Sequence, residues 1–181
     1  MTTELSFPER LALFKAEWYK HLQSIASEVT PKVDDCGRGI IQRRPDGFDY
    51  IVESYMRDRL DYHFPGWSWE SAAPLHFLGA EWVVAQGHLV IPDPYLAACG
   101  IQPPVRKFFG CDSVRIQYKT IKQKDLSGKE AKVSLPHTPE NIVDVGDNCK
   151  QANTAALKFS INRLCRIGDD VYGKRLEVSG E

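Results

Sequence analysis

The chain has 181 residues, of which 43% are hydrophobic and 26% charged, so it is long enough to bury a substantial core and has the composition of an ordinary soluble globular protein. Its formal net charge of −1 gives no general bias toward nucleic acid. An apolar run of about 18 residues would be needed for a membrane span, and none is present.

The N-terminal sequence and the cysteines indicate the compartment. The first residues, MTTELSFPERLALFK, carry acids before the apolar positions and lack a signal-peptide pattern. The five cysteines form an odd set without a CxxC pair. We therefore expect a cytoplasmic protein with free thiols, rather than a disulfide framework or a zinc knuckle.

Two helices are expected in the first third of the chain. Residues 6–28 carry an apolar stripe at helical spacing, which predicts a first helix. A second helix is expected from Asp49, as its N-cap, to about Phe64. On its surface Glu53 and Arg57 are four residues apart, which is the spacing of a favourable helical ion pair.

The segment 31–47 between these helices is broken by proline and glycine, so we expect a loop or a short strand. It contains the sequence GRGIIQRRPDG, in which the two isoleucines can pair in a sheet. Arg43 and Arg44 follow them and are expected to point outward, which makes both candidate phosphate contacts.

Strand patterns follow the second helix. Tryptophans alternate with polar residues over 67–70, and residues 82–91 form an alternating run, WVVAQGHLVI. A break rich in proline and glycine covers 92–110. Residues 113–119 then alternate again and predict a half-buried strand.

The predicted strand at 113–119 would place Arg115 and Lys119 on one solvent-facing side. Residues 125–129, DLSGK, resemble a hairpin turn, and a return strand is expected near 131–135. These elements together predict antiparallel strands in the middle of the chain.

One long helix is expected from Asp147, as N-cap, to Gly168, which suits a helix C-terminus. Polar residues recur along it at intervals of three and four and so form one stripe: Gln151, Thr154, Lys158, Asn162 and Arg166. Apolar residues cover most of the remaining circumference: Ala152, Ala156, Leu157, Phe159, Ile161 and Leu164. A core helix with one wet face is the alternative interpretation of this pattern.

The order helix, helix, antiparallel strands, helix predicts an α+β domain. We expect a single domain over residues 1–181, with an N-terminal helical part at 1–30.

The distribution of charge is less neutral than its sum. Residues 1–100 carry a net charge of −5 and residues 101–181 one of +4, which together give −1. Between Arg106 and Lys124 six cations face only Asp112, and such a patch can bind phosphate. Solvated surface is the alternative explanation of the run.

No catalytic or metal motif is found: GxSxG, HExxH, Walker A and dinucleotide fingerprints are all absent. The histidines are scattered, and the cysteines lack a visible partner base. The acidic pairs Asp34–Asp35 and Asp169–Asp170 could hold Mg²⁺, but neither has an evident third carboxylate. We therefore expect no catalytic residue, no metal and no cofactor.

Two segments resemble the single-strand annealing proteins of the Rad-fifty-two superfamily, which include short bacterial and phage members. They are YIVESYMRDRLDYHFPGWSW and KQANTAALKFSINRLCRIGDDVYG, separated by a meander of strands. Matches to the first family motif are Tyr50, Met56, Asp58, Arg59, Leu60, Asp61 and Trp67. Matches to the second are Ala152, Thr154, Ala156, Leu157 and Lys158, closed by Gly168 and Tyr172. The resemblance covers a core at about residues 38–175.

The chain departs from the family pattern at three places. Phe159 stands where the family has arginine, and Gln151 precedes Ala152, with Lys150 one position earlier. The segment between two strands of the meander, Pro92 to Gly110, is also longer than in the family.

The resemblance implies a β-β-β-α core in which the last helix packs against an antiparallel meander, with protomers joined into a ring or filament. It implies ATP-independent binding and annealing of single-stranded DNA in recombination and repair, with self-association and no membrane. A partner exonuclease or a host single-strand-binding protein is a further possible partner. The expected DNA contacts are Lys158, Lys150 and Arg163 on the last helix, Arg43 and Arg44, and, as a second surface, Arg106, Lys107, Arg115 and Lys119.

Two other classes of function stay open. One is a nonspecific single-strand-binding module of another fold, such as an OB-type barrel, which would need more strands and fewer helices. The other is an enzyme, either a small metal-dependent nuclease or a thiol hydrolase.

Overall fold

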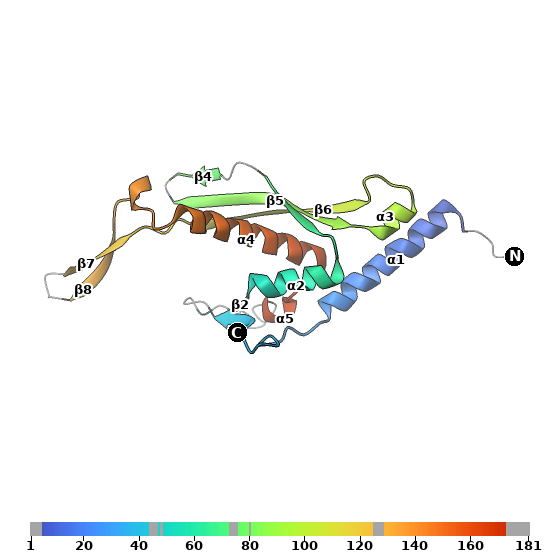
Figure 1. Ribbon diagram of the computed structural model, residues 1–181, viewed down its shortest axis with the longest axis horizontal. Coiled ribbons are helices and arrows are strands. Elements are labelled where there is room, and N and C mark those ends of the chain that lie inside the picture. The colour runs from blue at the N-terminus through green and yellow to red at the C-terminus, as the bar shows by residue number, and fades with distance from the viewer. Residues whose placement is uncertain are drawn as a thin grey trace, which may run out of the picture. The chain divides into compact units, whose positions relative to one another are not determined.

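The computed structural model describes residues 5–43, 47, 49–72, 76–79, 81–124 and 129–172 (Figure 1). The protein is α+β with antiparallel strand pairs, as predicted. The chain divides into two compact units, and each is described by itself. Unit 1 comprises Met1–Glu70, Leu89–Phe108 and Ser160–Glu181, and unit 2 comprises Ser71–His88 and Phe109–Phe159. The expectation of a single domain stays a prediction.

Unit 1 begins with helix α1, Phe7–Ala26, close to the predicted bounds. The Glu9 carboxylate accepts hydrogen bonds from the Ser6 backbone N–H at 2.8 Å and the Ser6 hydroxyl at 2.6 Å, so a local capping interaction fixes the start of the helix. Trp18 and Ile25 are its buried residues. The apolar spacing of the sequence therefore predicted the helix correctly.

Helix α2, Glu53–His63, confirms the second predicted helix and its surface ion pair, with 3.6 Å between the Arg57 and Glu53 side chains. The predicted cap is wrong. Asp49 belongs to strand β2, Asp49–Ile51, which pairs antiparallel with β1, Ile41–Arg43. The apolar residues of both strands pair across this small sheet, so the chain stays extended until the helix begins.

The larger sheet contains β3 (Ser68–Ser71), β4 (His76–Leu78), β5 (Trp82–Pro92) and β6 (Val105–Arg115). Strand β5 pairs with the other three. Its odd-numbered residues from 83 to 91 are buried, which confirms the predicted alternation.

The predicted break at 92–110 is wrong. It contains helix α3, Pro94–Ala98, and the first half of β6. Pairing with β5 extends β6 back to Val105, and the strand ends at Arg115, so the strand predicted over 113–119 lies too far along the chain. The prolines and glycines obscured the apolar content of the sequence VRKFFG.

Unit 2 also holds the hairpin of β7 (Thr120–Lys124) and β8 (Glu130–Ser134), which confirms the return strand predicted near 131–135. The predicted turn residues 125–128 lie outside the described residues. At the base of the hairpin the Lys119 backbone N–H donates to the Asn141 carbonyl at 2.8 Å, beside the 3₁₀ turn Pro139–Asn141.

Helix α4, Val145–Cys165, lies along the sheet strands in unit 2 (Figure 1). The predicted N-cap at Asp147 is three residues late. The Asp144 carboxylate accepts from the Asp147 backbone N–H at 3.0 Å, so Asp144 is the cap. The start was predicted too late because proline and glycine made the preceding segment look irregular. The helix ends before Arg166, whose φ of 55° is left-handed, two residues before the predicted Gly168.

Helix α5, Asp169–Tyr172, follows in unit 1. In the described residues no helix combines the length and apolarity needed to cross a membrane.

Candidate nucleic-acid interface

The unit 2 part of α4 has one solvent-accessible face, as the sequence predicted, and we call it the wet face. It carries Lys150, Gln151, Thr154 and Lys158. Ala152 and Ala156 are fully buried and Leu157 nearly so. The predicted polar stripe lies on the accessible side, with Gln151 exposed and Thr154 and Lys158 half-buried. Lys158 is therefore held on a packed helix, with part of its side chain reaching solvent.

Phe159 differs from its prediction. It was assigned to the buried side of the helix, but it is 40% exposed and directly follows Lys158 in the sequence. Ser160, which was not predicted to be buried, is fully buried instead. The wet face of α4 therefore combines a cation with an aromatic ring.

The other α4 candidates are also on the surface. Lys150 is exposed in unit 2, and Arg163 is exposed in the unit 1 part of the helix. Gln151 donates to the Asp147 carboxylate at 2.6 Å, one turn earlier. The first turn of this face therefore carries a negative group, the Asp147 carboxylate, as well as Lys150.

Arg106 is held by contacts within unit 1 rather than left as an isolated surface cation. Its guanidinium pairs with the carboxylate of Asp93, whose side chain is 0% exposed, and its Cζ lies 4.6 Å from the centre of the Trp18 ring. The same carboxylate caps α3, accepting from Tyr95 N at 2.8 Å and Leu96 N at 3.1 Å. These contacts hold Arg106 against the core of unit 1 and direct its charge toward Asp93.

Lys107, beside it, behaves differently. Its Nζ lies 2.7 Å from the Glu70 carboxylate, and both side chains are about half exposed. A surface pair of this kind contributes little to stability and exchanges readily with another anion. The two neighbouring cations of the basic run are thus not equivalent.

Arg115 and Lys119 are exposed in unit 2, but they do not share the regular strand that was predicted. Arg115 ends β6 and lies 3.6 Å from the Glu81 carboxylate. Lys119 comes after the strand, and its Nζ donates to the Glu140 backbone carbonyl at 3.0 Å.

The arginine pair before α2 is only partly described. Arg43 is the last residue of β1, and its side chain is exposed. Arg44 lies outside the described residues.

The sequence placed Lys122 and Lys124 in the basic run, but it did not predict that they share a face of the β7–β8 hairpin with Lys132. Lys122, Lys124 and Lys132 are all exposed there. The alternation of TIKQK and EAKVS on either side of the turn contained the signal, because residues two apart on a strand share a face.

One residue of each acidic pair considered for metal binding has other partners in unit 1. Asp34 accepts from the Cys36 and Arg38 backbone N–H groups and from the Arg38 guanidinium, and the Arg38 N–H is the main cause of its lowered pKa. Asp170 accepts from the Thr30 backbone N–H at 2.8 Å and the Thr30 hydroxyl at 2.7 Å. Within the described ranges, no three residues of metal-binding type lie close enough to hold an ion.

The cysteines are free thiols, as expected. Burial raises the pKa of the Cys165 thiol to about 12, so it remains protonated near neutral pH and is a poor nucleophile.

Comparison of the chain with protein-family models and with curated proteins gives no match.

Proposed function

We propose that this protein binds single-stranded DNA and anneals complementary strands without ATP, in recombination or repair, as a homo-oligomeric ring or filament with a β-β-β-α core. The observation that carries the proposal is the wet face of α4, where Lys158 and the exposed Phe159 are neighbours on a helix otherwise packed by small and apolar residues. The resemblance of two ordered motifs to the Rad-fifty-two superfamily supports it.

This pair of side chains suits an annealing protein. A lysine neutralises a phosphate without reading sequence, and an aromatic face stacks on any base. Both contacts leave the pairing edges of the bases free for a complementary strand. Arginine at position 159 would add a second charge, whereas phenylalanine adds a stacking surface.

Self-association is supported by the sheet and by the modest charge of one chain. Among the described strands, β6 pairs with β5 alone, and an edge strand of this kind can pair with another chain. A near-neutral protomer offers few phosphate contacts, and repetition around an assembly converts weak contacts into a firm grip along one strand.

The direct test measures affinity for a labelled oligo(dT) as a function of salt, with EDTA present and nucleotide omitted. Replacing Lys158 by Gln is expected to lower the log–log salt slope by about 0.7, the value for one lost contact to a single strand. Lys15→Gln is the matched control, because Lys15 is an exposed lysine of α1. An unchanged slope for Lys158→Gln would remove this residue from the interface.

Light scattering on the same samples tests assembly. We expect particles well above the monomer mass at micromolar protein, larger still with DNA. A strictly monomeric protein in both conditions would contradict the ring or filament.

A further inference from the structure

The β7–β8 hairpin is an uncovered element of unit 2. Every residue of both strands is exposed, and Figure 1 shows the hairpin extending away from β5 and α4. A two-stranded hairpin without a covering layer is only marginally stable in water. Packing against a core therefore does not explain which side chains it carries.

The two faces of the hairpin differ. The register pairs Ile121 with Val133, and these side chains are 48% and 41% exposed on one face. Lys122 is paired with Lys132 on the opposite face, since neighbouring positions alternate. The β-branched pair holds the strands in register, and the other face is left for charge.

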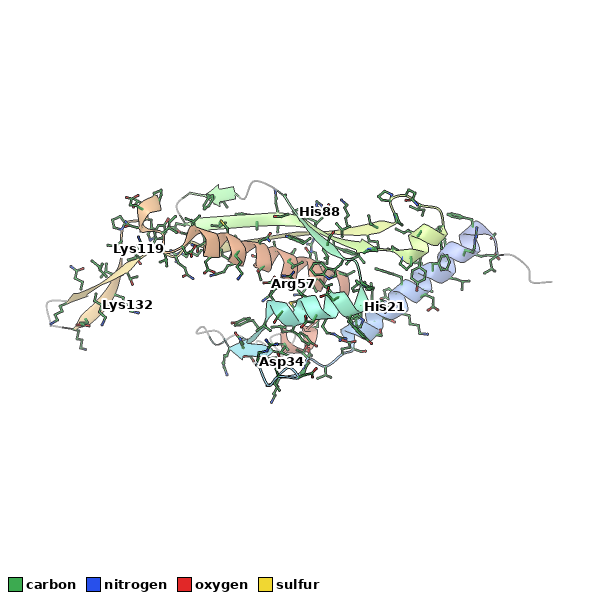
Figure 2. All side chains as sticks on the ribbon, in the orientation of Figure 1. His21, Asp34, Arg57, His88, Lys119 and Lys132 are labelled. Atoms are coloured by element: carbon green, nitrogen blue, oxygen red, sulfur yellow. The ribbon has the colours of Figure 1, made fainter. Side chains whose placement is uncertain are left out.

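The second face carries an excess of cations. The two strands place three lysines on this face, Lys122, Lys124 and Lys132, and one acid, Glu130. Lys122 and Lys132 lie directly across from each other, where like charges repel. Glu130 lies 3.3 Å from Lys122, whereas Lys124 and Lys132 make no ion pair with any described residue. An anion placed between the lysines would relieve the repulsion. Figure 2 labels Lys132 on the hairpin and Lys119 at its base.

We infer that this lysine face binds the sugar-phosphate backbone of DNA, as a contact separate from the wet face of α4. The inference rests on the proposed function, which makes DNA the polyanion that the protein binds. Lysines act as point charges and do not read bases, so the contact is independent of sequence. A two-stranded ribbon also fits the major groove of a duplex, so the hairpin could hold the annealed product as well as a single strand.

The test uses the full chain with Lys122 and Lys132 both changed to Gln. The control is Lys15→Gln with Lys20→Gln, which removes the same charge from exposed positions of α1. Binding to oligo(dT) and to a short duplex is measured over a range of salt. Loss of two contacts should lower the salt slope by about 1.4 for the single strand or about 1.8 for the duplex. If variant and wild type bind the single strand equally at 1 M salt, a slope difference of about 1.4 gives the variant a roughly 25-fold lower affinity at 0.1 M salt.

Two further variants sharpen the test. Glu130→Gln removes the carboxylate that competes for Lys122 and should raise affinity. Excision of residues 120–134 also removes Lys124, so it should lower the salt slope at least as much as the double lysine variant. The excised ends can be joined, because the Leu135 N–H donates to the Lys119 carbonyl at 2.9 Å.

The arm that changes identifies the ligand, single strand or duplex. Unchanged slopes in both arms, with wild-type protein that binds oligo(dT), would overturn the hairpin inference and leave the proposed function intact. A wild-type protein that does not bind oligo(dT) would overturn the proposed function. In that case, a slope change in the duplex arm alone would still support the hairpin contact, and no change there would overturn it too.

Discussion

Arg106→Ala is expected to destabilise the protein and to leave its DNA affinity unchanged at temperatures where it is folded. The substitution leaves the Asp93 carboxylate buried without its cation. A hydrogen bond to a charged group contributes about 1.5–3 kcal/mol, and a partly buried cation–π contact such as that with Trp18 about 0.5–2 kcal/mol.

The two backbone N–H groups of α3 still donate to Asp93 in the variant, which limits the loss. We therefore expect a decrease of about 2–3 kcal/mol in the free energy of unfolding, or roughly 5–10 °C in Tm for a chain of this length. Urea and thermal unfolding at fixed protein concentration measure it. A double-mutant cycle with Asp93→Asn isolates the energy of the pair.

Lys107→Gln is the matched control, because its partner Glu70 is a surface residue. That variant should cost no more than about 1 kcal/mol. Equal stability of the Arg106 and Lys107 variants would refute the structural role of Arg106. A drop of about 0.7 in the salt slope for Arg106→Ala would instead identify it as a DNA contact.

Two other predictions concern Phe159 and His63. Phe159→Ala should weaken oligo(dT) binding by about 1–3 kcal/mol, the range for one base stacked on an aromatic ring. Phe159→Leu is the control, because leucine keeps apolar volume but has no π-face. Equal affinities of both variants and wild type would exclude stacking. Burial lowers the pKa of His63 below its ordinary 6.5, so the unfolded chain takes up a proton at higher pH than the folded chain does. Stability should therefore fall as the pH decreases below about 6.5. In urea titrations, His63→Gln should lose less stability than wild type between about pH 7.5 and 5.5.

Short-range patterns in the sequence predicted the fold where local interactions dominate. The apolar stripe of α1, the Glu53–Arg57 pair and the alternation of β5 each involve residues within a few positions. Such interactions are fixed by helical or strand periodicity and are visible in one sequence.

Long-range pairing could not be predicted in the same way. Strand β6 begins inside a segment rich in proline and glycine because β5 supplies its hydrogen bonds. Arg106 looked like a free surface cation until the structure placed Asp93, thirteen positions earlier, against it. Phe159 looked like a core residue because hydrophobicity alone does not tell which side of a mostly apolar helix stays open.

The central claim is annealing without an energy source. The most direct measurement follows hybridisation of two complementary oligonucleotides at nanomolar concentration, with EDTA and without nucleotide, with and without the protein. We expect faster hybridisation with wild-type protein and a smaller acceleration with Lys158→Gln. Tight binding of the separate strands with no acceleration, or with slower hybridisation, would contradict it and indicate a protein that only covers single-stranded DNA.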